Sequence, residues 1–260
     1  MHIGRGSTVD RKIFKFPFEK QGITKFTCPE CNKGLLRVKK DTFHHKETRA
    51  SSKAKHYEEW EPEWIEYIFS CLFECTNSAC KDTVSCSGIG FVSEEYFYNE
   101  NGEPDRDYQD LFRPKYFTPH LKLFSLPAKT PEDIATEIFN SFSLFFSDPS
   151  SSANHIRIAL EHLLTYLKIK RFTTKNGKRH YLALHNRIEL LPQKFDHVKD
   201  IFIAIKWLGN AGSHSNHQIT MDDVLDSYEL MDELLVEIFS NTRGKAKTLA
   251  KKIIKKKGPK

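Results

Sequence analysis

The sequence of 260 residues lacks any apolar run long enough to cross a bilayer. A transmembrane helix needs roughly 18 or more consecutive apolar residues, and residues 1–18 also lack the uncharged apolar stretch of a secretory signal. The chain has no glycine-rich phosphate-binding loop, no Ser-His-Asp arrangement and no paired-carboxylate motif, so the enzyme classes that depend on these motifs are not indicated. We therefore expect a soluble, cytoplasmic protein without a membrane span.

The composition also excludes a collagen-like or wholly disordered chain. Hydrophobic residues make up 39% of the sequence, and 20 residues are Phe, which favours packed cores. A prior of roughly 150 residues per domain predicts one large or two small domains.

Acidic residues are missing from the end of the chain. Residues 243–260 contain nine Lys or Arg and no Asp or Glu, whereas residues 61–242 have a formal charge of −10 and residues 1–60 a charge of +7. The net charge of +6 therefore describes two basic ends around an acidic body, which suggests a basic tail rather than a basic domain.

Several lysines close together gain affinity for a phosphate backbone from counterion release, so we expect the tail to contact nucleic acid. The candidate residues are Lys251, Lys252, Lys255, Lys256 and Lys257. A solubilising tail and a contact with an anionic membrane surface remain alternatives.

Cysteine is absent outside residues 28–86. In an intracellular chain such clustering indicates a metal before disulfides. A C-x2-C pair and a C-x4-C pair, each in a turn between predicted strands, are typical of a zinc ribbon, in which four thiolates surround a structural Zn²⁺. The predicted ligands are Cys28, Cys31, Cys75 and Cys80.

Two cysteines are left over from this assignment. Cys71 and Cys86 lie within predicted strands, where a free thiol behaves as a small buried hydrophobe, although Cys71 with Cys75 remains an alternative second pair. The polar insertion of residues 39–60 carries His44, His45 and His56, which could be metal ligands. We interpret the insertion as a solvated loop or an extended hairpin because four cysteines already satisfy one ion.

Residues 93–130 are rich in Tyr, Phe and Pro, and we expect an extended connector there. Apolar residues then recur at helical spacing through residues 131–242, with helix-capping signals and short loops, which predicts five amphipathic helices. The region of residues 170–179 is expected to form a basic loop.

The predicted fold class is therefore α+β in two modules, a small β zinc ribbon followed by an all-α helical bundle. The expected organisation is a zinc-ribbon domain at 1–92, the connector at 93–130, the bundle at 131–242 and the tail at 243–260.

Residues from about 117 to about 241 resemble domain-of-unknown-function family 4145. The resemblance rests on Pro119-His120-Leu121, Pro127, Pro131, Ser147-Asp148-Pro149, Ile156 to Leu164, Leu184 to Leu191 and Ala204 to His214. That family is similar to the HEPN superfamily, a helical fold common in bacterial defence and restriction systems, which implies a HEPN-like bundle.

HEPN ribonucleases carry Arg, a polar residue that is often Asn, three more residues and then His. They cut RNA without metal, usually across a homodimer. Asn210 and His214 match this pattern, but Gly209 stands at the Arg position. The resemblance implies His214 as acid or base and Asn210 as orienting group. Lys206 lies one turn upstream of Asn210 and could present a substitute cation on nearly the same face of the helix.

Arg157 and Glu161 are spaced i, i+4 on the second predicted helix and could support that site. A purely structural role for all five candidate residues is the competing interpretation, in which Asn210 and His214 satisfy the helix end and Arg157 and Glu161 form an interhelical ion pair.

The leading functional hypothesis is a non-catalytic accessory protein that binds nucleic acid or a partner protein of a bacterial defence system. Its motivation is the missing Arg at Gly209. A divergent endoribonuclease that uses His214 is the second hypothesis, and a pure dimerisation module that pairs through the bundle is the third.

Overall fold

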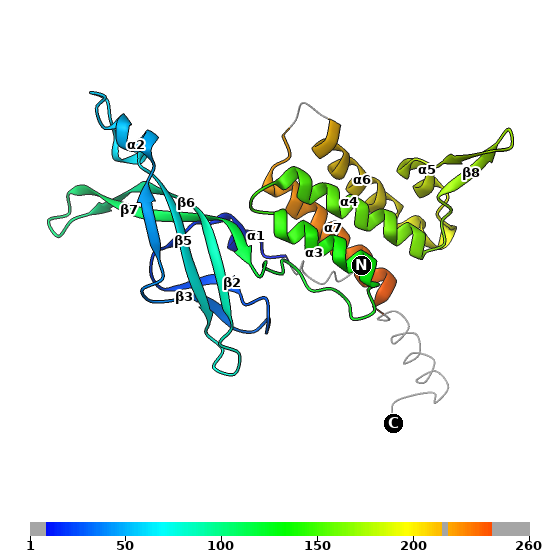
Figure 1. Ribbon diagram of the computed structural model, residues 1–260, viewed down its shortest axis with the longest axis horizontal. Coiled ribbons are helices and arrows are strands. Elements are labelled where there is room, and N and C mark those ends of the chain that lie inside the picture. The colour runs from blue at the N-terminus through cyan, green and yellow to red at the C-terminus, as the bar shows by residue number, and fades with distance from the viewer. Residues whose placement is uncertain (1–8, 215–217, 241–260) are drawn as a thin grey trace. The chain divides into compact units, whose positions relative to one another are not determined.

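The computed structural model describes residues 9–214 and 218–240, and for residues 211–214 it describes the backbone alone. The chain divides into two compact units (Figure 1). The sheet unit comprises Asp10–Leu123 and Phe142–Pro149, and the remaining described residues form the helical unit. Within the described residues, no helix has both the length and the apolar character that a membrane crossing requires.

The sheet unit is built on one antiparallel sheet of seven strands in the order β1-β7-β6-β5-β3-β2, with β4 also paired to β5. Its elements are α1 (Arg11–Lys15), β1 (Phe18–Glu19), β2 (Ile23–Thr27), β3 (Leu35–Val38), β4 (His44–Glu47), α2 (Arg49–Ala54), the 3-10 helix η1 (Pro62–Trp64), β5 (Glu66–Cys75), β6 (Thr83–Tyr98) and β7 (Pro104–Thr118).

The core of the sheet unit is made of phenylalanine. Successive side chains of a strand point to opposite faces, and in the second half of β5 the residues Phe69, Cys71, Phe73 and Cys75 are buried while Ser70 and Glu74 are exposed. The aromatic rings that meet on this inner face belong to Phe18, Phe26, Phe43, Phe69, Phe73 and Phe112. Most of these pairs are edge-to-face or tilted, and Phe43 and Phe69 are stacked, which are geometries that aromatic pairs favour.

The expected small zinc ribbon is wrong, because the first module is a large sheet. Residues 93–118, which we expected to form an extended connector, form the end of β6 and all of β7, and these strands pair from Ser85↔Thr118 to Tyr98↔Pro104. Pro104 starts a strand and Pro114 lies at a register shift. A sheet tolerates proline at both kinds of position. Gly102, with a φ of 76°, allows the turn between the two strands.

The helical unit contains four long helices, which Figure 1 shows side by side. Its elements are α3 (Glu132–Leu144, of which the last three residues belong to the sheet unit), α4 (Pro149–Tyr166), β8 (Phe172–Lys175), β9 (Lys178–Tyr181), α5 (Leu184–Glu189), the 3-10 helix η2 (Gln193–Val198), α6 (Lys199–His214) and α7 (Met221–Phe239).

The periodic apolar residues form the core of this unit, as the helical spacing indicates. On α4 the residues Ile156, Leu160, Leu163 and Leu164 are fully buried. At the start of α7 the Thr220 side chain accepts a hydrogen bond from the Asp223 amide and the Asp223 carboxylate accepts one from the Thr220 amide, a capping box that satisfies two helix-end donors.

The helical unit is not all-α. The expected basic loop is a hairpin in which β8 pairs with β9 from Phe172↔Tyr181 to Lys175↔Lys178. Asn176 and Gly177 have φ angles of 51° and 71°, the left-handed values that a tight two-residue hairpin turn requires. The Asn-Gly pair signals this turn, but the flanking residues are charged and show no apolar alternation.

Candidate functional site

Strand pairing brings two cysteine-bearing turns together at one end of the sheet unit. Cys28 follows β2 directly and Cys75 ends β5. Leu36 of β3 lies opposite Cys75. The turn between β2 and β3, which carries Cys28 and Cys31, therefore lies beside the turn that follows β5, which carries Cys80. The Cys28 amide donates to the Gly34 carbonyl at 2.8 Å, and the Cys80 amide donates to the Asn77 carbonyl at 2.9 Å, so each turn is closed by the backbone.

Four sulfur atoms converge between these turns. The Sγ atoms of Cys28, Cys31, Cys75 and Cys80 all lie within 4.8 Å of one another. The Cys28 and Cys80 sulfurs are 3.9 Å apart, and those of Cys31 and Cys75 are 3.6 Å apart. A tetrahedral ion with metal–sulfur bonds of about 2.3 Å places its ligands about 3.8 Å apart. The cluster therefore has the separation of a four-thiolate metal site and is compatible with a structural metal.

The backbone around the cluster favours thiolate at one ligand. The amides of Gly34 and Lys33 lower the pKa of Cys31 to about 6, because a hydrogen bond to the charged form stabilises it. Burial raises the pKa of Cys75 to about 12, since desolvation disfavours a charged thiolate. A bound cation reverses this second effect, because a coordinating thiol is deprotonated by the ion.

Two backbone amides point at the sulfurs from outside the cluster. The Gly34 amide donates to Cys31 Sγ and the Asn77 amide donates to Cys75 Sγ, each at 3.4 Å. A Cβ atom at Gly34 would lie 2.5 Å from Cys75 Sγ and 2.8 Å from the Asn77 amide nitrogen. Only glycine fits between the two turns without moving them.

The other cysteines and the histidines of the insertion lie outside this cluster. Cys71 and Cys86 are buried and directly opposite each other on β5 and β6. Burial raises the pKa of Cys86 well above its usual range, which makes it an unreactive thiol. His44 and His45 lie on β4, a strand within the insertion that we expected to form a solvated loop or an extended hairpin.

In the helical unit, Gly209, which the resemblance places at the arginine position of HEPN ribonucleases, has no room for a side chain. A Cβ atom at Gly209 of α6 would lie 2.5 Å from the Cβ of Arg157 and 3.2 Å from the Ala153 carbonyl oxygen, both on α4. Gly209 is therefore the residue that lets α4 and α6 approach each other.

The neighbouring candidate residues also have structural surroundings. Lys206 is only 8% exposed, and its Nζ lies 3.7 Å from the centroid of the Trp207 ring, a cation–π contact. Asn210 is half-buried on the same helix. The side chain of His214 lies outside the described residues, as do all five lysines of the tail.

Arg157 and Glu161 pair within α4, not between helices, with Arg157 Nη2 and Glu161 Oε1 3.2 Å apart. The Tyr181 hydroxyl donates to the other oxygen of Glu161 at 2.9 Å. The fully buried Arg187 donates to the Glu161 carbonyl and to Thr165 Oγ1. Glu161 thus ties α4 to β9 and lies beside a buried guanidinium that the sequence analysis missed.

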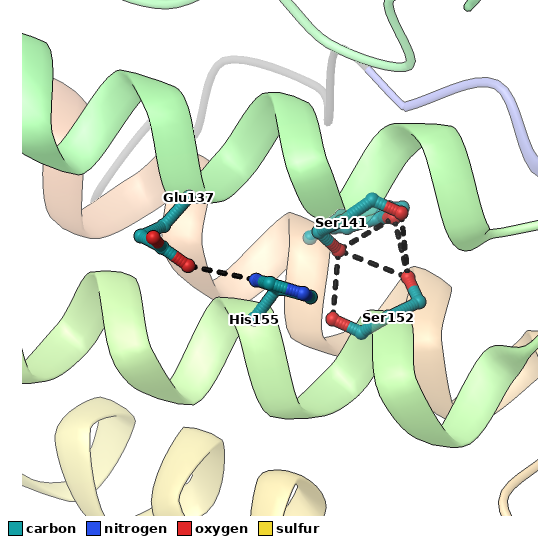
Figure 2. A network of polar contacts seen from close by, with 5 residues as sticks. Glu137, Ser141, Ser152 and His155 are labelled. Atoms are coloured by element: carbon teal, nitrogen blue, oxygen red, sulfur yellow. Dashed lines mark hydrogen bonds and ion pairs between the residues drawn. The ribbon is translucent and has the colours of Figure 1, made fainter.

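A second polar network that sequence analysis missed joins α3 and α4 (Figure 2). Buried Ser141 and Ser152 lie within hydrogen-bond distance of each other and of the Tyr228 hydroxyl, each at 2.9 Å. Glu137 and His155 form a pair at 2.7 Å next to them. Polar residues at apolar helix positions were the available signal, and because their partners are far apart in the sequence, spacing alone does not pair them.

These features define a two-unit protein, with an antiparallel sheet that carries a four-cysteine cluster and a separate helical unit. Residues 16–117 match the family model described as "Domain of unknown function (DUF8608)", and residues 139–256 match that described as "Domain of unknown function (DUF4145)". The resemblance to family 4145 is thereby confirmed over the second range. No curated protein and no solved structure matches the chain.

Proposed function

We propose that this protein is a non-catalytic nucleic-acid-binding protein whose sheet unit is held together by a structural Zn²⁺. The observation that carries the binding proposal is the run of nine basic residues without an acid at residues 243–260. A charge density of this kind supplies sequence-independent affinity for phosphate. The resemblance to HEPN proteins also favours a homodimer and a partner in a bacterial defence system.

Zinc is the metal that the four cysteines favour. Zn²⁺ takes four thiolates in a tetrahedral shell with no open position, so it supplies fold stability and no Lewis-acid chemistry at such a site. Cys28, Cys31, Cys75 and Cys80 would hold it, and the amides of Gly34 and Asn77 would orient two of the sulfurs.

The packing at Gly209 supports the non-catalytic part of the proposal. An arginine there would require α4 and α6 to separate, because even a Cβ atom meets Arg157. Lys206 does not replace the missing arginine as an exposed cation, because its side chain is buried. In HEPN ribonucleases an arginine stabilises the phosphorane. Here Gly209 has no side chain and Lys206 is buried, so neither residue supplies an exposed cation in its place.

The tail is tested by two matched five-fold variants of the full chain, in which Lys251, Lys252, Lys255, Lys256 and Lys257 are all replaced by Gln or all by Arg. Binding to a labelled oligonucleotide is measured by fluorescence anisotropy across a series of salt concentrations. Five lost phosphate contacts lower the slope of log affinity against log salt by about 4. We expect the Gln variant to show this loss and the Arg variant to keep the wild-type slope. Equal slopes for all three proteins would refute the role of the tail.

A divergent endoribonuclease is the second candidate function, favoured by the intact Asn210-x3-His214 spacing. In that mechanism His214 moves the proton as a general acid or base, the role that histidine fills most often in enzymes. It predicts metal-independent RNA cleavage that is lost in His214→Ala.

A further inference from the structure

Two rows of side chains cross four neighbouring strands on the side of the sheet opposite the phenylalanine core. The first row consists of Lys46, Ile68, Ile89 and Arg113, and the second of His44, Ser70, Ser87 and Tyr116, each residue lying opposite the next across β4, β5, β6 and β7. We call these eight residues the outer face.

The middle of the outer face is apolar and open. Ile68 is 57% exposed, Ile89 is 40% exposed and Tyr116 is 60% exposed. Ile68 and Ile89 are direct cross-strand partners, so the exposed groups form one patch rather than scattered residues. Contiguous apolar surface rimmed by polar residues marks an interaction site.

Cations flank this patch on both sides. Lys46 on β4 and Arg113 on β7 end the first row, and both are exposed. The Arg113 guanidinium lies over the Phe91 ring, 4.4 Å from its centroid, which holds the charge at the surface. The acids on the same side of β5 are Glu66 and Glu74, each at one end of the strand, so the first row of the outer face carries two cations and no acid.

A shallow depression adjoins Tyr116. Its volume is about 300 Å³, and the residues that line it include Thr42, Ser70, Ser85, Ser87, Tyr116 and Thr118. The Thr42 and Ser85 hydroxyls already donate to backbone carbonyls. The exposed Tyr116 ring at the edge of the depression offers a surface on which a base can stack.

We propose that the outer face binds single-stranded nucleic acid, with an unpaired base stacked on Tyr116 and phosphates beside Lys46 and Arg113. Single strands are held by this combination of aromatic platforms and a positive surface, whereas a second protein chain on an apolar patch would not need cations on both flanks. The inference rests on the proposed function for its ligand class and adds a contact surface separate from the tail.

The test measures the affinity of the zinc-loaded full chain for labelled oligo(U) RNA and oligo(dT) DNA, each about 16 nucleotides long, and for a duplex of equal length. Stacking of one base contributes enough affinity that Tyr116→Ala weakens single-strand binding by about tenfold. Tyr116→Phe keeps the ring and stays within about twofold of wild type. Duplex binding is unchanged in both variants, because paired bases are not free to stack.

Tyr98→Ala is the matched control, since Tyr98 is 78% exposed at the far end of β6 and outside the outer face. If Tyr116→Ala lowers the melting temperature, Lys46→Gln and Arg113→Gln replace it, and each is expected to reduce the salt slope by about 1. Wild-type affinity in all outer-face variants, with weaker binding when the tail lysines are neutralised, overturns this inference and leaves the proposed function standing. Absence of binding by the wild-type chain to every probe overturns both.

Discussion

A single glycine sets how closely the two cysteine turns approach. The space that a Cβ at Gly34 would occupy is already taken by Cys75 Sγ and by the Asn77 backbone, and the Gly34 amide itself donates to Cys31 Sγ. Lowering the pKa of Cys31 to about 6 gives the cluster one ligand that is a thiolate near neutral pH before any ion binds. The backbone at Gly34 thus contributes to the site both by its amide and by the space that it leaves for Cys75.

We predict that Gly34→Ala weakens zinc binding by about 10- to 100-fold, the cost of disturbing the groups that orient metal ligands. The added methyl group pushes Cys75 and Asn77 away from the position where the four sulfurs meet. Competition with a chromophoric chelator measures the affinity. Ser78→Ala is the control, because Ser78 is exposed in the same turn. Equal affinities for the two variants would contradict the steric argument.

The spacing of the cysteines was enough to select four of six as a cluster, because a short turn aims two thiolates at one point. It did not reveal the size of the sheet that carries them. β6 and β7 pair along nearly their whole length, but aromatic residues with prolines lack the strict alternation that marks a strand with one buried face. The outer half of this hairpin is exposed on both faces, so there was no buried stripe to detect.

At the scale of elements, helix periodicity predicted much of the helical unit. The stripe of Ile156, Leu160, Leu163 and Leu164 is buried as expected, and Thr220 caps α7. The packing of α4 against α6 was not predictable in the same way. Glycine is a poor residue for a helix interior, yet Gly209 lies inside α6, where the absence of a side chain allows close contact with Arg157.

We predict that Gly209→Ala lowers the free energy of unfolding by about 1–3 kcal/mol, as overpacking in a tight interface does. This sign opposes the gain of about 1 kcal/mol that Ala brings to an exposed helix position. Chemical denaturation measures the change. Asn210→Ala, at the next residue of α6, reports the helix-propensity effect at a position that already carries a side chain. If Gly209→Ala stabilises the protein as much as Asn210→Ala does, the close approach is refuted.

At the scale of the whole molecule, the net charge of +6 is the sum of regions of opposite sign. The acidic middle of the chain is flanked by a basic first 60 residues and a tail that carries nine basic residues. Lys46, on the outer face, belongs to the basic N-terminal part. Nucleic acid is therefore expected to engage the tail and the outer face, each of which is tested by its own variants.

The central claim, that the protein binds nucleic acid without cutting it, is tested most directly by one assay. End-labelled RNA is incubated with excess protein, with and without a metal chelator, and each sample is run on a native gel and on a denaturing gel. The account predicts a shifted band on the native gel and intact RNA on the denaturing gel. Metal-independent cleavage that disappears in His214→Ala would contradict it.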